Sequence, residues 1–426
     1  MTQIRPAGLI VGLGIILGLV IIVAGVLSTG SDNGEDDTTD ELATENVTPT
    51  DSDADMPDDV PEDDPPSPDA TPDATNGATS DVSDDIDDID VETDAEADEE
   101  VAETDHVTPY REDPLTEEEL SEYRPNELGK VLVLMYHRIE QQDNPEDVWT
   151  RTPDQFRGDL QWLYDNDFYV IPIRDYIRNQ INIPPGKRPV ILTFDDGTVG
   201  QFRMSEHDGS LMIDPDSAVG ILEDFFNRYD DFGRGGLFSI LPLAPFAWPD
   251  AEDQRDYAGQ KLQWLIDNGY ELGNHTVGHV NMGETPDDEI KSELARAEIL
   301  IQEYVPEAEI SVLAVPFGVY PNQGETEIFE GWEYQGDEYA LEGALMVGAE
   351  PAPSPSHVEF DPMWIPRING DDEQLGRWFS YVEDNPGIIY VSDGNPNTVT
   401  IPENLHPSLV DTLDETKIEG KDVIRY

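Results

Sequence analysis

The sequence lacks cysteine entirely, and only six of its 23 basic residues are lysine. Without cysteine the chain forms no disulfide bond, carries no lipid-modified cysteine and has no thiolate metal site. A bound metal ion must therefore take its ligands from histidine and carboxylate side chains. Basic residues are few compared with the 94 acidic residues, and the formal net charge is therefore −71. Such a chain is unsuited to neutralising phosphates, and we expect no nucleic-acid partner.

The acidic residues are densest in the first third of the chain. Residues 31–120 hold 36 of them against one basic residue, Arg111, and almost no aromatic side chain. Such a segment buries too little apolar surface to offset the entropy lost on ordering, so we expect a disordered acidic linker over residues 31–121. Cation binding by acidic runs such as Asp84–Asp90 is the alternative to a plain solvated spacer. The rest of the chain is acidic too, which fits either a salt-adapted organism or a genome that favours arginine over lysine.

One long apolar run is present, near the N-terminus. Ala7–Leu27 is uncharged for 21 residues, which is enough for a helix to span a bilayer core of roughly 30 Å. A secretory signal has a shorter apolar core, although cleavage near Ala24 is the alternative. With Arg5 upstream and acid downstream, the positive-inside rule puts the N-terminus in the cytoplasm. We therefore expect residues 1–30 to be a single-pass anchor in the cell membrane that holds residues 122–426 outside the cell.

Short apolar runs alternate with helical patterns in residues 122–426. Eight runs are typical of buried strands: Val131–Tyr136, Tyr169–Ile173, Val190–Phe194, Leu237–Leu241, Glu271–Asn274, Val312–Val315, Ala344–Val347 and Ile388–Val391. Strands that alternate with helices predict a parallel sheet, and roughly 300 residues is a usual size for an α/β barrel. The sheet is either open or closed into a barrel, and in both cases the chemistry lies at the carboxyl ends of the strands. Of the two we expect a distorted (β/α) barrel of about seven parallel strands.

Two helix starts carry the same signal, a threonine followed by a proline. Thr152 and Pro153 fit the N-cap and first position of a helix, and Thr285 and Pro286 repeat the pattern. A third helix is expected to end at Gly269.

Two carboxylates follow the expected strand Val190–Phe194. Asp195 and Asp196 are adjacent and precede Gly197. Neighbouring side chains at a strand end point in different directions, so one carboxylate can bind a metal ion while the other acts as a base. A lone Asp-Asp-Gly is usually a turn, so a functional interpretation depends on the strand before it and on other motifs nearby.

Two histidines follow the expected strand Glu271–Asn274. His275 and His279 are four residues apart, and a helical turn would place both imidazoles on one side. Together with one carboxylate they would leave open positions on a zinc ion, as in catalytic rather than structural sites. An ion held in this way polarises a carbonyl group and lowers the pKa of water. A lone His-x-x-x-His is more often a surface feature, but here both motifs follow strands.

Together these motifs resemble the polysaccharide deacetylases, the NodB-homology or carbohydrate esterase family 4 enzymes. The resemblance runs from about Leu132 to Ile368. Its segments are Met135-Tyr136-His137-Arg138-Ile139, Thr193-Phe194-Asp195-Asp196-Gly197, Glu271-Leu272-Gly273-Asn274-His275 and Val315-Pro316-Phe317-Gly318. Their order is similar to that of the extracellular, circularly permuted branch that includes poly-N-acetylglucosamine deacetylases.

The resemblance implies a role for each matching residue. Asp195 is implied as the general base. The ligands of a divalent ion, most often Zn²⁺ in this family, are implied to be Asp196, His275 and His279. The loop Pro316-Phe317-Gly318 is implied to form a wall beside the substrate and the oxyanion.

Two departures from the family pattern move roles to other residues. The last expected strand lacks the histidine that donates a proton in unpermuted relatives, and in the permuted branch this role falls on the first strand, here on His137. Ala314 stands where an arginine usually orients the base, and Arg367 is the candidate substitute. The plainer alternatives are a hydrogen-bonded histidine at a strand end and an arginine in an ordinary salt bridge.

Two further features are interpreted from composition. The polar stretch Gln201–Ala218 is expected to be a surface insertion. Five aromatic residues near expected loops are candidates for stacking on sugar rings or for the core: Phe246, Trp248, Trp332, Trp364 and Trp378.

The resemblance implies hydrolysis of acetyl groups on an extracellular or cell-surface polysaccharide, foremost the N-acetyl groups of N-acetylhexosamine units. An O-acetyl esterase with the same mechanism is one alternative. A non-catalytic surface protein that binds carbohydrate with the same fold is the other. The paired carboxylates favour an enzyme, because a binding protein needs no base beside its ligand. The sequence specifies neither the polymer, nor the metal ion, nor the oligomeric state.

Overall fold

The computed structural model describes residues 109–426 except 143, 145, 208, 209, 250 and 349. The expected anchor over residues 1–30 and most of the expected linker lie outside the described residues. In the part of the chain that is described, no helix combines the length and the apolar character needed to cross a membrane.

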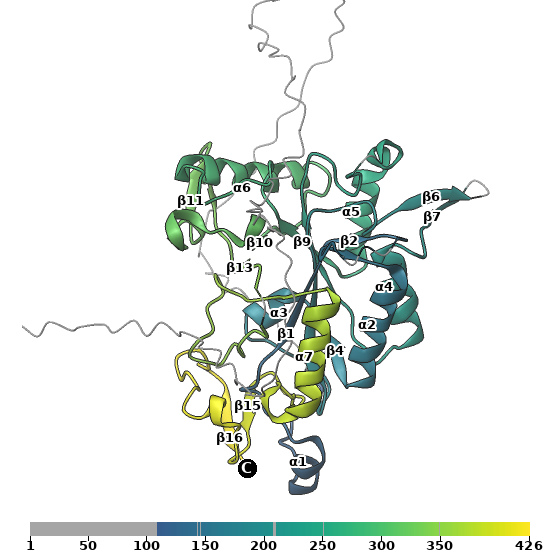
Figure 1. The fold of residues 1–426 in the computed structure, drawn as a ribbon. Helices are drawn as coiled ribbons and strands as arrows, with labels where there is room; N and C mark the ends of the chain where they lie inside the picture. The colour runs from purple at the N-terminus through teal and green to yellow at the C-terminus, as the bar shows by residue number, and fades with distance from the viewer. Residues whose placement is uncertain (1–108, 143, 145, 208–209, 250, 349) are drawn as a thin grey trace, which may run out of the picture. The chain divides into compact units, whose positions relative to one another are not determined.

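A single parallel sheet organises the described domain (Figure 1). Its strands are β1 (Leu132–Tyr136), β4 (Phe168–Val170), β5 (Arg188–Phe194), β8 (Leu237–Ile240), β9 (Glu271–Asn274), β10 (Val312–Ala314), β13 (Gly343–Leu345) and β14 (Ile368–Asn369). Seven of them follow the order β13-β10-β9-β8-β5-β1-β14, and β4 pairs with β5 beside this path. Leu345 in β13 also bridges to Ile365, just before β14. The two ends of the sheet therefore approach each other, and the expected curled, parallel sheet of about seven strands is confirmed.

The described residues form seven α-helices around the sheet. They are α1 (Glu117–Tyr123), α2 (Pro153–Asp165), α3 (Ile173–Ile177), α4 (Ala218–Arg228), α5 (Ala258–Asp267), α6 (Asp287–Gln302) and α7 (Asp372–Asp384). Short 3₁₀ turns connect them at η1 (Glu252–Tyr257), η2 (Pro316–Gly318), η3 (Pro321–Gln323), η4 (Glu327–Phe329), η5 (Pro386–Ile388) and η6 (Pro407–Leu409).

Four small two-stranded pairs decorate this frame. They are β2 (Arg138–Ile139) with β3 (Thr150–Arg151), β6 (Met204–His207) with β7 (Ser210–Ile213), β11 (Trp332–Tyr334) with β12 (Asp337–Tyr339), and β15 (Thr398–Ile401) with β16 (Asp422–Arg425). The antiparallel hairpin β6–β7 lies within the expected insertion and projects from the body of the domain (Figure 1).

The alternation of side chains along β1 explains how the core divides. Leu132 and Leu134 pack outward with Phe156 of α2, whereas Val131 and Val133 face inward. Inward-facing residues of β5, β8, β10 and β13 join the same inner cluster. Because successive residues of a strand point to opposite faces, a curled sheet encloses one apolar cluster and presents another to its helices.

The helix signals have mixed outcomes. Thr152 caps α2 as expected, since its side chain accepts a hydrogen bond from the Gln155 amide, and α5 ends just before Gly269, whose φ is +79°. The expected cap at Thr285 is wrong. Helix α6 begins at Asp287 after an N-cap at Pro286, and the Thr285 hydroxyl instead donates to the Asn281 carbonyl.

Two expected boundaries also differ. The segment Ile388–Val391 is not a strand of the sheet, because β1 already has β5 on one side and β14 on the other. It forms only isolated bridges to Asn126 and Lys130 ahead of β1. Helix α1 begins inside the expected linker, where Thr116 and Glu119 form a reciprocal capping box.

Candidate active site

The carboxyl ends of β5 and β9 bring three candidate metal ligands together. Asp196 follows β5, and His275 and His279 follow β9. The Asp196 Oδ1 lies 3.2 Å from His275 Nε2 and 3.6 Å from His279 Nε2. All three ligand atoms lie within 4.8 Å of one another, a spacing that a single ion can bridge.

The backbone orients His275 for this task. Its Nδ1 lies 2.8 Å from the carbonyl oxygen of Ala314 at the end of β10, so Nδ1 donates and Nε2 faces Asp196. A histidine whose second nitrogen is held in this way has a fixed tautomer and ring orientation, as metal-binding histidines usually do. Ala314 therefore contributes through its backbone, where the family pattern suggested a side chain.

The loop between the two histidines is not the helical turn that their spacing predicted. Thr276 and His279 both have positive φ, at +61° and +50°. The amides of Val277 and Gly278 donate to one carboxylate oxygen of Glu293 on α6, at 3.0 and 2.7 Å. A carboxylate from another element therefore shapes the loop, and the chain offers no local signal for it.

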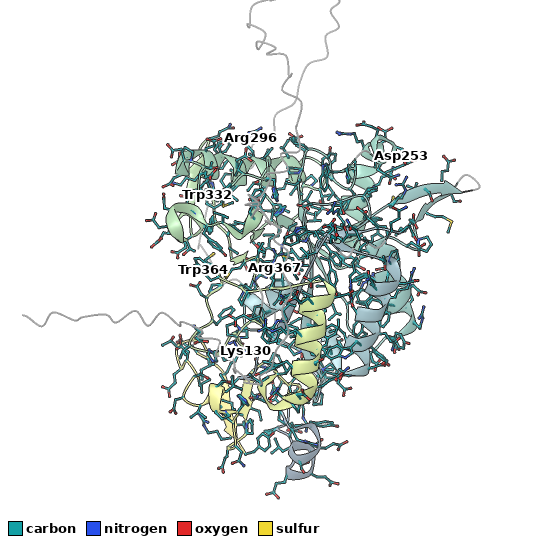
Figure 2. The ribbon with its side chains drawn as sticks, in the orientation of Figure 1. Lys130, Asp253, Arg296, Trp332, Trp364 and Arg367 are labelled. Carbon is teal, nitrogen blue, oxygen red and sulfur yellow. The ribbon has the colours of Figure 1, made fainter. Side chains whose placement is uncertain are left out.

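The second carboxylate, Asp195, is held by Arg367. The two guanidinium nitrogens of Arg367 each donate to a different Asp195 oxygen at 2.7 Å. A further bond ties the Arg367 Nε to the Met346 carbonyl. Both side chains are buried, and Figure 2 places Arg367 in the middle of the described domain. Burial would raise the pKa of Asp195, but Arg367 outweighs it and holds that pKa below its ordinary value, so Asp195 is a carboxylate.

His137 follows β1 and lies near Asp195. Its Nε2 is 3.9 Å from an Asp195 oxygen, and its ring packs on Trp149 with centroids 4.6 Å apart. Its carbonyl accepts hydrogen bonds from the side chains of Thr198 and Gln201. Burial lowers the pKa of His137, although Asp195 and Asp196 act in the opposite direction.

The two carboxylates and the three histidines line one cleft of about 240 Å³. Three partly exposed aromatic side chains form its rim: Trp149, Trp248 and Phe317. Of the five aromatic residues named from the sequence, only Trp248 lines the cleft. Trp149 was missed, because nothing in its local sequence distinguishes it.

The loop Pro316-Phe317-Gly318 contributes mainly Phe317. This residue has φ of +56° and its ring lies 4.4 Å from that of His279. Gly318 also has positive φ, and a Cβ there would approach the Cβ of Val347 to 2.8 Å. Pro316 and Gly318 do not line the cleft, so Phe317 is the residue of this loop that does.

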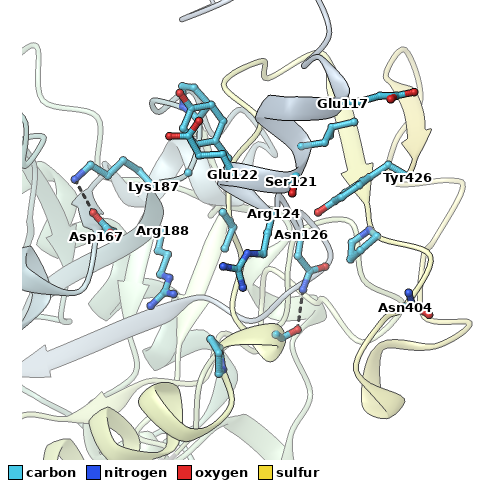
Figure 3. A pocket seen from close by; sticks show the side chains of 18 residues that line it. Glu117, Ser121, Glu122, Arg124, Asn126, Asp167, Lys187, Arg188, Asn404 and Tyr426 are labelled. Atoms are coloured by element: carbon cyan, nitrogen blue, oxygen red, sulfur yellow. Dashed lines mark hydrogen bonds and ion pairs between the residues drawn. The ribbon is translucent and has the colours of Figure 1, made fainter.

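A larger cavity of about 1290 Å³ lies elsewhere (Figure 3). Its lining includes Arg188, the first residue of β5, and Asp167, just before β4, which places it at the amino ends of the strands. Arg124 and Asn126 also line it, and none of its lining residues is a histidine. Size alone therefore does not mark the site, since the clustered ligands and the paired carboxylates lie at the opposite end of the sheet.

Comparison with known proteins supports this placement. The family model for polysaccharide deacetylase matches residues 251–328, which include both histidines and the Phe317 loop. Over these residues the chain is similar to the polysaccharide deacetylases. Asp195, Asp196 and His137 lie outside the matched residues, so only the structure brings them to the deacetylase site.

Solved structures also match the chain, at low sequence identity. IcaB from Ammonifex degensii is 16% identical, with a TM-score of 0.45, covering 60% of this chain and 97% of that one. A polysaccharide deacetylase from Bacillus cereus is 17% identical, with a TM-score of 0.44, covering 59% and 69%. A Streptococcus pyogenes deacetylase in complex with acetate is 17% identical, with a TM-score of 0.42, covering 58% and 97%. These values are too low to transfer any residue's role, and no curated protein sequence matches the chain.

The residues of the deacetylase site fit a divalent ion. Two imidazole nitrogens and one carboxylate oxygen converge, which is a donor set that zinc and similar ions accept. Burial and the neighbouring His275 lower the pKa of His279 to about 4, so its imidazole is neutral and able to bind a metal.

Proposed function

We propose that this polysaccharide deacetylase hydrolyses the N-acetyl groups of N-acetylhexosamine units, with a divalent ion, foremost Zn²⁺, held by Asp196, His275 and His279. The observation that carries the proposal is a charged, oriented carboxylate beside a metal-binding triad. Asp195 is clamped by Arg367 at 2.7 Å and lines the same cleft as the three ligands. Two adjacent carboxylates thereby have separate surroundings and separate tasks.

The divalent ion supplies Lewis acidity toward the acetyl carbonyl. Asp195 accepts a proton from the attacking water as its oxygen bonds to the carbonyl carbon. Arg367 keeps that carboxylate ionised and fixed in direction, so the base is ready before substrate arrives. The C–N bond then breaks, and the nitrogen leaves as an amine that needs a proton. Acetate is the other product.

His137 is the proposed donor of that proton. It lines the cleft, and its Nε2 lies 3.9 Å from the Asp195 oxygen that also accepts from Arg367. The lowered pKa of His137 works against this role, whereas the nearby carboxylates favour it. Its packing on Trp149 fixes the ring plane.

We also propose the cellular setting. Residues 1–30 anchor the chain in the cell membrane, and residues 31–121 are mostly a spacer that places the deacetylase domain outside the cell. The supporting observations are the uncharged run Ala7–Leu27 and the 36 acidic residues that follow it. The substrate is then an extracellular or cell-surface polysaccharide.

Acetate release from a panel of N-acetylated and O-acetylated glycans tests the proposal. The full chain, purified in detergent and loaded with zinc, is expected to release acetate from N-acetylhexosamine polymers. Release from O-acetylated glycans alone would establish the esterase alternative. Binding of glycans without any release would establish the non-catalytic alternative.

A further inference from the structure

The insertion Gln201–Ala218 forms a second cleft beside the catalytic one. This cleft has a volume of about 250 Å³. Arg203 and Asp214 line it, and they directly precede and follow the two strands of the hairpin β6–β7. Both clefts lie at the carboxyl ends of the strands, because this one is also lined by Thr198, shortly after β5.

The two clefts share a wall and one side chain. Arg138, the residue after His137, lines both. Trp248 lines the catalytic cleft and Pro249 lines the second. The Val199 amide donates to the Trp248 carbonyl at 2.8 Å, so a hydrogen bond joins segments that line the two clefts. Two cavities that adjoin in this way can hold consecutive units of a single polymer.

The lining of the second cleft suits a sugar. Ile139 and Val199 supply apolar surface, whereas Arg203, Asp214 and Asp216 supply donors and acceptors for hydroxyl groups. A small number of placed polar groups on an apolar lining is the usual composition of a specific small-molecule site. Each cleft is smaller than the ~300–1,000 Å³ typical for a drug-sized ligand, so each accommodates about one ring.

The walls of the second cleft are held in place by bonds between separate elements. Asp216, at the base of the insertion, accepts hydrogen bonds from Arg157 of α2 at 2.6 Å and from Gln141 at 3.0 Å. Gln254 of η1 bonds Met204 at the start of the hairpin in both directions. The cleft is therefore built from three parts of the chain and does not depend on the hairpin tip.

We infer that this second cleft binds the sugar unit next to the one being deacetylated. The insertion is then a specificity element, and the deacetylase prefers polymers and longer oligomers to short ones. This inference rests on the proposed function and adds the length preference of the substrate to it.

A matched pair of arginine variants tests the inference. Arg203 lines the second cleft and makes an exposed ion pair with Asp253, so Arg203→Ala removes one donor at little expected loss of stability. Arg255 makes a similar exposed ion pair with Glu252 and does not line the cleft, so Arg255→Ala is the control. Glu140→Trp, at an exposed lining position, obstructs the cleft by bulk and provides an independent variant.

The readout is kcat/KM for N-acetylhexosamine oligomers of increasing length and for an aryl acetate that occupies only the catalytic cleft. The parent enzyme is expected to gain activity with oligomer length. Arg203→Ala and Glu140→Trp should each reduce that gain roughly tenfold, as expected for one lost charged hydrogen bond or a blocked ring site. Aryl acetate turnover should be unchanged in both, and Arg255→Ala should behave as the parent.

Two results would overturn the inference. One is an unchanged length dependence in both cleft variants. The other is an equal loss on aryl acetate and long oligomers, which would place the damage in the catalytic cleft. A parent enzyme that cleaves aryl acetate but no N-acetylated oligomer would instead contradict the proposed function, and the inference with it.

Discussion

Asp195 is a buried carboxylate whose charge is maintained by one arginine. The pairing with Arg367 joins residues that are 172 positions apart. The resemblance to the deacetylases implied Asp195 as the base and gave Arg367 only as a candidate partner. Their contact depends on β14 lying beside β1, two strands from β5, and β14 was not predicted because it is only two residues long.

A substitution of His137 distinguishes a role as general acid from a purely structural role. In His137→Ala, turnover of an acetamide substrate should fall by about 10²–10⁴, the usual worth of positioned acid–base catalysis. Turnover of an aryl acetate should fall much less, because an aryloxide leaves without a proton. Steady-state kinetics on both substrates provide the measurement. An equal loss on both would assign His137 a structural role.

Lys261 gives a stability prediction away from the catalytic cleft. It is fully buried, donates to the Phe246 carbonyl and the Gln254 amide oxygen, and burial lowers its pKa to about 7. The folded state therefore binds fewer protons than the unfolded state between about pH 7 and the ordinary lysine pKa. The penalty of burying this amine is full below pH 7 and declines as pH rises through that window.

Lys261→Met should consequently gain stability relative to the parent near pH 7, and that advantage should shrink as pH rises toward 10. Urea unfolding of both proteins at several pH values measures the difference. A difference that does not change with pH would contradict the assignment of a depressed pKa to Lys261.

At the scale of elements, the loop after β9 is shaped from outside itself. The spacing of His275 and His279 predicted that a helical turn would let both imidazoles reach one ion, but that turn does not form. Glu293 accepts two amides of this loop, which allows the left-handed conformations at its ends. The histidines can be identified from the sequence, whereas the contact with Glu293 that bends the loop cannot.

Glu293→Ala should therefore weaken metal binding by ~10–100-fold, the usual effect of removing a residue that supports a metal ligand. Thr152→Ala is a suitable comparison, because it removes the N-cap of α2 and should cost about 1 kcal/mol of stability without affecting metal affinity. Metal titrations against a competing chelator compare the two variants. Equal affinity in Glu293→Ala and the parent would show that the loop holds its shape without this carboxylate.

At the scale of the whole molecule, the overall fold was easier to predict from the sequence than the pairing of individual segments. The curled parallel sheet was predictable because apolar runs alternate with helical patterns, and the helix caps at Thr152 and Gly269 followed from local chemistry. The strand predicted at Ile388–Val391 does not belong to the sheet. Its apolar sequence is typical of a strand, and in the structure the segment makes only isolated bridges to the residues before β1. Only the pairing of β1 with β5 and β14 rules it out.

The acidic segment should be separable from the folded domain. Deleting residues 32–105 is expected to shift the melting temperature by less than ~2 °C, because this segment lacks apolar surface to bury. Activity on soluble oligomers should be unchanged, whereas activity on cell-bound polymer should fall if the segment acts as a spacer. A large loss of thermal stability would show that the acidic segment packs on the domain.

The central claim is that Asp195 and the metal ligands have separate tasks in one cleft. It is tested most directly by measuring metal content and acetate release together in two variants of the full chain. Asp195→Asn should keep one ion per chain and lose several orders of magnitude in kcat, because Asp196 is untouched. Asp196→Asn combined with His275→Ala should lose both the ion and the activity. Retention of stoichiometric metal in the double variant, or parent-like turnover in Asp195→Asn, would contradict the account.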